Sequence, residues 1–495
     1  MDLLILQCIL VYPINRNSYE GLQVIDSELK NRLILDNPWW TTGAVEVQVQ
    51  RLARRAFVNP FLERVRGGQG VAAILTGPGH VGKSVLVKQA IAKLLEGQID
   101  PKFIIYVRLD NPAFSNMNLV ELLDHAFDAS GVGLGGKGAY VFLDDMHNVP
   151  EWEHVLHETA KHYPECRLTA VSALMPSAEM TEISIDPAKK DAKDQPGPFI
   201  QTILPPVLFA EYLHILRIRE KLFDSYGKLE DLEGLNAAFV DYVNSGGFPE
   251  VAFSIGRQVN NVDVVSKIIH RDLAGLCGIA DHREVAKLMT RLALESGLET
   301  SIENLSKDMN VAKNTLRKYL EFLESAYLIK RIWRIDGKGK RFQRQTRFKV
   351  YLTSPSMRAG LTGPAAAEDE AMGRLAETAV ISQFMHSPTF QRLFYAFWKK
   401  GRKHKHVALV EMPLKGDKPI KCIELDWSNK AIARPHEVLG DMLEFLDENN
   451  PTTPSKALTR NMSGKRFVGD HEIGFMPVSV WSFAVGQVLL TGSVN

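Results

Sequence analysis

The stretch GPGHVGKS, residues 77–84, limits what this chain can fold into more than any other part of it. It fits the pattern G-x-x-x-x-G-K-[ST] without a gap, and the apolar run before it and the amphipathic helical pattern after it extend over residues 71–95. Its glycines let the backbone curl, so that N–H groups and the N-terminus of the following helix face phosphate oxygens. The stretch predicts a nucleotide-binding loop between a strand and a helix. The alternative is a glycine-rich surface turn.

The loop also assigns roles to individual side chains. Lys83 is expected to contact the β and γ phosphates of ATP, and Ser84 is expected to ligate Mg²⁺. The loop backbone would surround the phosphates. The nucleotide-binding residues predicted from the motif are Gly77, Pro78, Gly79, His80, Val81, Gly82, Lys83, Ser84 and Val85.

Two adjacent acids follow a second apolar run, YVFLDDMHNVPEW at 140–152. The run places Asp144 at the C-terminal edge of a sheet, where it can hold the water shell of Mg²⁺. Asp145 is predicted to polarise the attacking water. Its side chain is shorter than the glutamate of many ATPases by about 1.3–1.5 Å, and a misplacement of about 1 Å can cost on the order of 10²-fold in rate. Slow hydrolysis is therefore expected; the alternative is that both acids merely solvate a strand end.

Further short apolar runs at 103–111, 139–145 and 167–173 alternate with helical stretches, which predicts a parallel α/β sheet with crossover helices. A length of 495 residues exceeds one ordinary core and predicts two to four domains. The four cysteines (Cys8, Cys166, Cys277 and Cys422) lie far apart, as expected of reduced thiols in a cytoplasmic protein. The apolar start of the chain is too short to cross a membrane, and no later segment reaches that length.

The formal net charge of +1 says nothing about partners, so any nucleic-acid signal must be local. Residues 301–335 have the spacing of a helix-turn-helix, and the stretch 311–349 holds twelve basic residues against three acids. This pattern predicts duplex DNA binding through a winged helix; the alternative is a winged helix that docks a protein partner. The predicted DNA-binding residues are Lys313, Arg317, Lys318, Lys338, Lys340, Arg341 and Arg344.

Two smaller features remain open. WKKGRKHKH at 398–406 is expected to be a solvated loop, although it could extend the same DNA-binding groove. The aromatic stretch NPWW at 37–40 and Trp152 are expected to pack in the core or anchor a loop rather than to contact a base or a partner.

Taken in order, these stretches resemble the predicted AAA+-type ATPases of bacteria and archaea, which join a P-loop domain to a winged helix and a restriction-endonuclease-like C-terminal domain. The resemblance covers roughly residues 40–430. The stretches that carry it are LTGPGHVGKSVLVKQ, VFLDDMHNVPEWE, RLTAVSAL, ILPPVLFAEYL, YVNSGGFPE, LSKDMNVAKNTLRKYLEFLESAYLIKRI and GRLAETAVISQF.

The resemblance implies roles that the residue pattern alone does not. Thr169 falls where the family carries its polar sensor of the γ-phosphate, just past the fourth strand, and Asp145 replaces the catalytic glutamate. His147 stands where the family usually has glutamine. Pro198 stands where the family tends to place Gly-Arg, so this position offers no arginine to a neighbouring subunit. The catalytic residues expected on this basis are Lys83, Asp145 and Thr169, with Ser84 and Asp144 on the metal.

The C-terminal domain departs most from the family pattern of Glu, Asp and Glu-x-Lys around a divalent metal. Glu377 and Glu424 remain, but Ala408 occupies the position of the middle acid and Asp426 that of the lysine. Loss of both groups predicts an inactive nuclease fold.

The chain is thus expected to be an α/β P-loop ATPase that binds ATP and Mg²⁺ and associates with DNA. The alternative is an ATP-gated scaffold or signalling protein that binds a protein partner with little or no hydrolysis. Either form could oligomerise. The expected divisions are an N-terminal segment (1–60), the ATPase core (61–207), a helical lid (208–281), the winged helix (282–352), a linker (353–370) and the nuclease-like domain (371–495).

Overall fold

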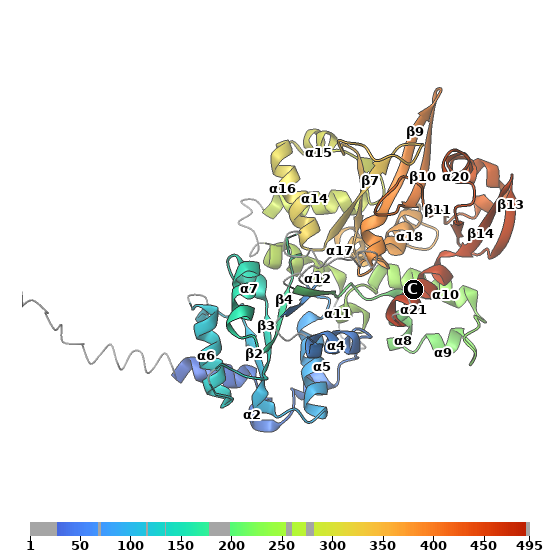
Figure 1. Ribbon diagram of the computed structural model, residues 1–495. Coiled ribbons are helices and arrows are strands. Elements are labelled where there is room, and N and C mark those ends of the chain that lie inside the picture. The colour runs from blue at the N-terminus through green and yellow to red at the C-terminus, as the bar shows by residue number, and fades with distance from the viewer. Residues whose placement is uncertain are drawn as a thin grey trace, which may run out of the picture.

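A parallel sheet of five strands forms the centre of the N-terminal half of the computed structural model (Figure 1). Its order is β2-β3-β4-β1-β5, so β4 separates the strand before the phosphate loop from the strand that ends in the two acids. The structure describes residues 27–67, 71–114, 117–133, 135–177, 199–253, 260–273 and 282–491. The five strands are β1 (Ala72–Thr76), β2 (Ile104–Arg108), β3 (Tyr140–Asp144), β4 (Arg167–Ser172) and β5 (Phe199–Ile203).

Helices cover both faces of this sheet, which is why β1 and β3 are buried along their whole length without alternation. One apolar core joins the sheet to α6 (Leu119–Ser130) and α7 (Trp152–His162). A second core joins the opposite face to α4 (Val58–Gly67) and α5 (Lys83–Glu96). Short 3₁₀ turns stand between these elements: η1 (Pro101–Phe103), η2 (Pro112–Phe114) and η3 (Met146–Asn148).

The NPWW stretch closes the outer edge of the sheet at β2. The indole N–H groups of Trp39 and Trp40 both donate to the carbonyl of Ile104, at 2.8 and 2.9 Å. Asn37 exchanges two hydrogen bonds with the backbone of Tyr106. These contacts satisfy polar groups that an edge strand would otherwise expose, so the expected anchoring role of 37–40 is the one found. Two short helices belong to this region, α2 (Trp39–Thr42) and α3 (Val47–Gln50).

The segment after β5 is helical and lies between the sheet and the C-terminal part of the chain (Figure 1). Buried side chains of α8 and α10 share one apolar core with helices α18 (Ala371–Ser382) and α21 (Val478–Thr491). The last helix therefore returns to pack against α8, far from it in the sequence. The elements of this segment are α8 (Phe209–Ile215), α9 (Arg219–Leu222), α10 (Leu232–Ser245), α11 (Pro249–Ala252), α12 (Asn261–Lys267) and the π-helical turn η4 (Ile268–Asp272).

Residues 282–352 form three helices and three short antiparallel strands. The strands pair in the order β7-β8-β6. The apolar faces of the helices pack with these strands into a separate core. The elements are α14 (His282–Leu294), β6 (Glu299–Thr300), α15 (Ile302–Met309), α16 (Lys313–Ser325), β7 (Ile329–Ile335) and β8 (Phe348–Leu352).

The C-terminal α/β unit continues the sheet of the preceding unit, because β7 pairs in parallel with β9. The result is one nine-stranded sheet in the order β13-β14-β12-β11-β10-β9-β7-β8-β6. Its elements are α18 (Ala371–Ser382), η5 (Pro388–Arg392), β9 (Leu393–Lys400), β10 (Lys403–Glu411), β11 (Lys421–Asp426), α19 (Lys430–Ala433), α20 (Pro435–Asn449), β12 (Ser455–Thr459), β13 (Gly464–Val468), β14 (His471–Pro477) and α21 (Val478–Thr491).

The stretch 353–370, expected to be a linker, is instead folded. It contains α17 (Ser356–Thr362), and Ser354, Ser356 and Met357 are buried against the neighbouring helices. Its Gly, Ser and Pro content reflects close packing: a Cβ at Gly360 would come within 2.6 Å of the carbonyl oxygen of Asn261. Within the described residues, no helix is both long and apolar enough to cross a membrane.

Candidate nucleotide site

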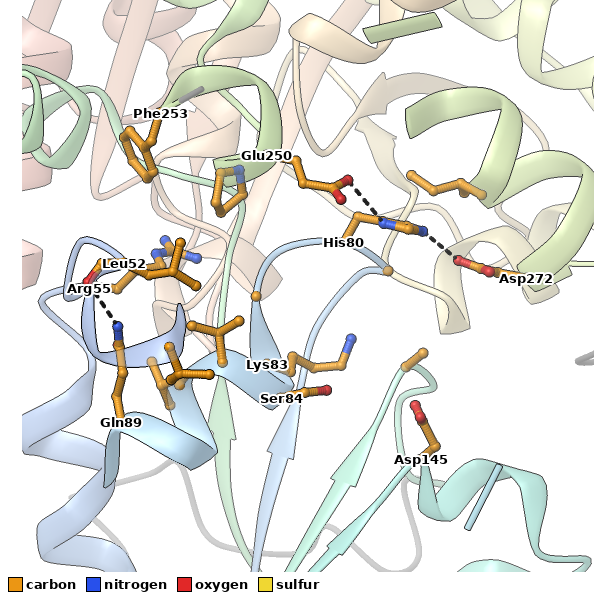
Figure 2. Close-up of a pocket in the computed structure, with 18 of the residues that line it drawn as sticks. Leu52, Arg55, His80, Lys83, Ser84, Gln89, Asp145, Glu250, Phe253 and Asp272 are labelled. Atoms are coloured by element: carbon orange, nitrogen blue, oxygen red, sulfur yellow. Dashed lines mark hydrogen bonds and ion pairs between the residues drawn. The ribbon is translucent and has the colours of Figure 1, made fainter. Parts of the chain in front are cut away.

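A cavity of about 1250 Å³ opens above the phosphate loop, at the carboxyl end of the parallel strands (Figure 2). It is lined by the loop itself with the start of α5, the segment 48–55, the lid around α11 and η4, and the turn at 326–328 that joins α16 to β7. Residues just past β2, β3 and β4 and the end of α8 complete the lining; among them are Asp110, Asp145, His147, Ala173 and Ile215. A ligand there would contact the sheet, the lid and the 282–352 unit together.

The loop adopts the curled backbone that its glycines permit. Gly77, His80 and Gly82 have φ angles of 147°, 60° and 89°. A Cβ at Gly77 would overlap the carbonyl of Leu204, so only glycine fits there. Gly82 immediately precedes α5, whose first residue is Lys83, which places the N–H groups of the first helical turn at the end of the loop. This is the arrangement that the motif predicts.

Lys83 is buried beneath the loop. Its Nζ donates to the carbonyl oxygens of Gly77 and Pro78, at 2.9 and 2.8 Å. Burial lowers its pKa to about 8, against the opposing effects of Asp145, Asp144 and Asp272. A buried cation held only by neutral carbonyls would gain from an anionic partner. Lys83 is thus placed to bind phosphate oxygens.

The two adjacent acids face different surroundings. Asp144 is 1% exposed and does not line the cavity. Its Oδ2 accepts the Tyr106 hydroxyl at 2.6 Å, and its Oδ1 accepts the N–H of Asp145 at 3.0 Å. Asp145, in a left-handed conformation (φ 56°), does line the cavity and lies across from Lys83 and Ser84 in Figure 2. The assignment of Asp144 to the water shell of Mg²⁺ stays a prediction; in this structure Asp144 lies behind the cavity wall and accepts the backbone N–H of Asp145.

Burial, with the neighbouring carboxylates of Asp144 and Asp110, raises the pKa of Asp145 to about 6, against the effect of Lys83. An acid that titrates near neutrality is matched to proton transfer from water. Asp110, just past β2, also lines the cavity. The hydroxyl of Ser84 and the carboxylates of Asp145 and Asp110 are hard oxygen donors of the kind that suits Mg²⁺.

Thr169 does not lie at the site. It pairs with Ala73 on β1 and Phe142 on β3, three residues before the end of β4, and it is fully buried. β4 ends only at Ser172, so the expectation from the family resemblance that Thr169 follows the fourth strand is wrong. Its buried hydroxyl has no hydrogen-bond partner among the described residues.

His147 occupies the space that was expected for that sensor. It lines the cavity from η3, and its Nδ1 accepts the N–H of Ala173 just past β4, at 3.1 Å. Burial lowers its pKa to about 4, with Lys83 adding to the effect. The ring is neutral at pH 7 and, since Nδ1 accepts, carries its proton on Nε2. His147 therefore offers a fixed N–H donor.

The lid contacts the loop through His80. Its Nε2 lies 3.1 Å from Oδ2 of Asp272 on η4, and its Nδ1 lies 3.6 Å from Oε2 of Glu250 on α11 (Figure 2). A Cβ at Gly79 would also lie 3.1 Å from Asp272 Oδ2. Two lid carboxylates thus lie against the loop whose motif predicts phosphate binding.

The far end of the cavity is apolar and suits the base of a nucleotide. Its side chains come from the 48–55 segment, from the end of α8 and from the lid: Val49, Leu52, Ile215, Leu216 and Phe253. Leu52 is 48% exposed.

A buried ion pair joins these parts of the cavity wall. Arg55 makes two bonds to Glu211 on α8, at 3.0 and 2.7 Å, and a third to the carbonyl of Val81 in the phosphate loop, at 3.0 Å. Because both charges are buried and paired, loss of either would leave the other uncompensated. Arg55 therefore connects α8, at the apolar end of the cavity, to the phosphate loop.

The predicted DNA-binding residues lie on two elements. Lys313, Arg317 and Lys318 are exposed on the first turns of α16. The other four are exposed in the segment 336–347 between β7 and β8; they are Lys338, Lys340, Arg341 and Arg344. Arg341 is partly engaged, since it donates to the carbonyl of Pro413 at 2.6 Å.

Two arginines of the basic stretch 311–349 contact other side chains of the protein instead. Arg331 pairs with Glu324, and Arg334 lies between the rings of Phe342 and Phe397. The excess of positive charge on the surface is therefore smaller than the sequence suggests.

The C-terminal carboxylates form a buried cluster with a lysine from β8. Tyr351 donates to Glu377 at 2.6 Å, and Lys349 Nζ lies 3.5 Å from the same oxygen. Glu424 accepts the N–H of Ala408 at 3.1 Å, and its burial raises its pKa to about 8. Among the described residues no group of three or more His, Cys, Asp or Glu side chains could hold a metal ion.

Asp426, at the expected lysine position, bonds to neighbouring residues rather than to the carboxylate cluster. Its Oδ1 accepts the backbone N–H and hydroxyl of Ser428, and its Oδ2 accepts the N–H of Ala431. It thus bonds an N–H of the first turn of the short helix α19. Lys349 thus supplies the charge next to the carboxylates, from a strand that the sequence assigned to another domain.

Comparison with known families identifies the nucleotide-binding part. Residues 69–213 match the family model described as "AAA domain". This segment is similar to that family, and we refer to residues 69–213 as the AAA domain. Residues 236–368 match a second family, described as "Domain of unknown function (DUF8612)", which runs from α10 in the lid to α17.

Similar proteins add little about function. An uncharacterized protein of Haemophilus influenzae is 20% identical over 302 residues, which cover 59% of this chain and 69% of that protein. Uncharacterized protein MJ1637 of Methanocaldococcus jannaschii is 22% identical over 294 residues, covering 56% of this chain and 59% of that protein. The match thus spans less than two thirds of the second relative.

Two solved structures are also similar. "Structure of Drosophila ORC bound to DNA" is 12% identical with a TM-score of 0.26, covering 72% of this chain and 96% of that chain. "Structure of C. elegans PCH-2" is 14% identical with a TM-score of 0.21, covering 54% and 67%. At these TM-scores the likenesses support no inference about this chain.

Several residues around the AAA domain carry no signal in the sequence. Arg55, Leu52 and Asp272 are brought to the cavity by tertiary folding from segments without a recognisable motif. Only His147 had a local indication, because it stands where the resembled family has another polar residue.

Proposed function

We propose that the chain is an ATPase that binds and slowly hydrolyses ATP in the AAA domain, and that residues 282–352 are a winged helix that associates with duplex DNA. Nucleotide would draw the lid and the winged helix against the AAA domain, and hydrolysis would release them. The order of helices and strands in 282–352, with exposed cations on α16 and on the β7–β8 segment, supports the DNA-associated part.

The position of helix α16 is the main observation in favour of this proposal. α16 begins with Lys313, among the exposed cations, and ends at Ser325, beside the nucleotide cavity. Thirteen residues of α-helix span roughly 20 Å. Just past its end, Ala326 and Leu328 line the cavity, and the carbonyl of Ser325 accepts the N–H of Met175 past β4, at 2.7 Å. A shift of the helix on DNA would reach the nucleotide directly.

In this proposal, different residues of the cavity have different roles in ATP hydrolysis. Lys83 would exchange two loop carbonyls for phosphate oxygens, and the hydroxyl of Ser84 and the carboxylate of Asp145 would lie near a bound Mg²⁺. Mg²⁺, when bound, neutralises charge on the β and γ phosphates. Asp145 accepts a proton from the attacking water, as its raised pKa allows. The Nε2–H of His147 donates to the γ-phosphate, and the apolar end excludes water from the base.

The test is the salt dependence of binding to a labelled duplex of random sequence. Variant Lys338→Ala/Lys340→Ala/Arg344→Ala removes three exposed cations and should lower the slope of log affinity against log salt by up to about 2.7, at about 0.9 per phosphate contact. Variant Lys313→Ala/Arg317→Ala/Lys318→Ala should weaken binding as well. The matched control, Lys102→Ala/Lys137→Ala/Lys161→Ala, removes three cations from the AAA domain and should bind as the wild type does. Unchanged binding by both test variants would favour the protein-docking scaffold.

A further inference from the structure

Strands β9 and β10 continue well beyond the sheet that they belong to. β9 pairs with β7 only through Phe394–Ala396, and β10 pairs with β11 only through Leu409–Glu411. Within the described part of the chain, the outer residues 397–406 pair only with each other, turning at Gly401 (φ 60°). Figure 1 shows this two-stranded ribbon projecting from the molecule.

The ribbon is strongly basic. No Asp or Glu occurs between 396 and 410, a stretch that carries Lys399, Lys400, Arg402, Lys403 and Lys405. Lys400 stands directly opposite Lys403, and Lys399 opposite His404. Like charges that face each other across a strand pair are destabilising, and an isolated two-stranded ribbon is marginal in water. An anionic ligand would relieve both costs.

The protein neutralises only two of the five cations of the ribbon. Acids of α20 pair with Lys400 (Glu444, 3.1 Å) and with Lys405 (Asp441, 2.8 Å). The side chains of Lys399, Arg402 and Lys403 are exposed and make no ion pair with any residue that the structure describes. These two interactions anchor the ribbon in place and leave three cations for a partner.

The base of the ribbon is joined to the β7–β8 segment. Gly337 lies against the ring of Trp398, so closely that a Cβ there would come within 2.7 Å of it. Arg334 stacks on Phe397 and donates to its carbonyl at 3.0 Å. Lys338 and Lys340 follow Gly337 directly, and both are exposed. The cations of the β7–β8 segment and those of the ribbon therefore border one another.

We infer that the β9–β10 ribbon is a second DNA-binding element, in which Lys399, Arg402 and Lys403 contact the phosphate backbone of a duplex that also lies on the β7–β8 segment. A two-stranded ribbon has the width that the major groove accepts. The tip offers cations, histidine and glycine but no exposed apolar anchor of the kind that protein interfaces require, so a polyanion suits it better than an acidic protein. That the polyanion is DNA rests on the function proposed above.

The test uses the full chain and a labelled duplex of random sequence. Variant Lys399→Ala/Arg402→Ala/Lys403→Ala should have a melting temperature no lower than that of the wild type, because it removes facing like charges, and should lower the slope of log affinity against log salt by up to about 2.7. The matched control, Lys430→Ala/Lys465→Ala/Arg466→Ala, removes two exposed cations from β13, at the far edge of the same sheet, and one from α19, and should leave the slope unchanged.

Two results would overturn the inference. If the ribbon variant keeps the wild-type slope while the Lys338/Lys340/Arg344 variant loses it, the ribbon is not a DNA contact and the proposed function stands. If the ribbon variant and its control lose affinity equally, the effect is one of overall charge. Loss of slope in the ribbon variant alone would instead support the ribbon and contradict the assignment of the β7–β8 segment.

Discussion

The hydroxyl of Tyr327 lies 2.8 Å from Oγ1 of Thr76, and the amide of Gln201 donates to both, at 3.0 Å. Thr76 is the last residue of β1, directly before the phosphate loop, and Tyr327 follows α16 in a left-handed conformation (φ 58°). This contact links the start of the phosphate loop to the turn after the helix that carries the predicted DNA-binding residues. It gives the proposed coupling a specific atomic path.

Tyr327→Phe should break that path while keeping the ring in place. Thr76 and Gln201 still bond to each other, so the cost to stability should be about 1 kcal/mol. ATP binding and DNA binding should each remain near wild type, while the effect of DNA on ATP turnover should fall. Turnover measured with and without duplex checks this. Full stimulation in the variant would show that the contact carries no coupling.

Asp145→Glu lengthens the acid that faces the cavity and should raise ATP turnover by on the order of tenfold, since a displacement of about 1 Å is costly in catalysis. Asp145→Asn should lower it by at least about 10²-fold, because the amide cannot accept a proton. Phosphate release under saturating ATP and Mg²⁺ is the measurement. An Asn variant with wild-type turnover would mean that another group activates the water.

Asp272→Asn removes a negative charge that lies against Gly79 and His80 in the phosphate loop. Because that charge repels a triphosphate, ATP should bind more tightly, by on the order of tenfold. Titration calorimetry measures the affinity. Asp241→Asn, an exposed acid on α10 of the same lid, is the matched control and should have no effect. Equal or weaker binding by the Asp272 variant would contradict the repulsion.

Glu424→Gln tests the buried carboxyl cluster through pH. Burial raises the folded pKa of Glu424 to about 8, above its ordinary value of 4.5, so the folded state holds a proton there that the unfolded state releases. This contribution to stability is complete below about pH 4.5 and is lost as pH rises through about 8. The Gln variant lacks this dependence. Its free energy of unfolding relative to wild type should therefore increase between pH 5 and 8, as measured in urea; a constant difference would contradict the raised pKa.

The purified chain should not cut DNA in Mg²⁺ or Mn²⁺. Ala408 offers no carboxylate, and Asp426 is bonded to the start of α19. Gel analysis of plasmid DNA after incubation with either metal is the assay, and Glu424→Ala is the control. Metal-dependent cleavage that this substitution abolishes would show that the cluster is a working nuclease site.

Local patterns in the sequence were enough to predict the parallel sheet and the phosphate loop. GPGHVGKS and the apolar run before Asp144 are short stretches that determine the structure of their own backbone. The strand-loop-helix geometry that they predict is the one observed. The roles of Asp144 and Thr169 could not be assigned in this way. Which of two adjacent acids faces the cavity depends on the left-handed backbone at Asp145, and the depth of Thr169 depends on where β4 ends.

Contacts between distant segments were beyond the reach of the sequence. Nothing local signals that Arg55 pairs with Glu211, that Lys349 reaches Glu377, or that β7 pairs with β9. The last of these joins what looked like two domains into one sheet, and it brings the 398–406 cluster against the β7–β8 segment. The choice between a solvated loop and a DNA contact thus depends on tertiary structure.

The central claim is that DNA on α16 and the 336–347 segment acts on the nucleotide cavity. Steady-state ATP turnover of the wild-type chain, with and without saturating duplex DNA, tests it most directly. The account predicts that DNA changes the turnover, and that Lys313→Ala/Arg317→Ala/Lys318→Ala loses this change while keeping its basal rate. Identical turnover of the wild type with and without DNA, under conditions where the duplex is bound, would contradict it.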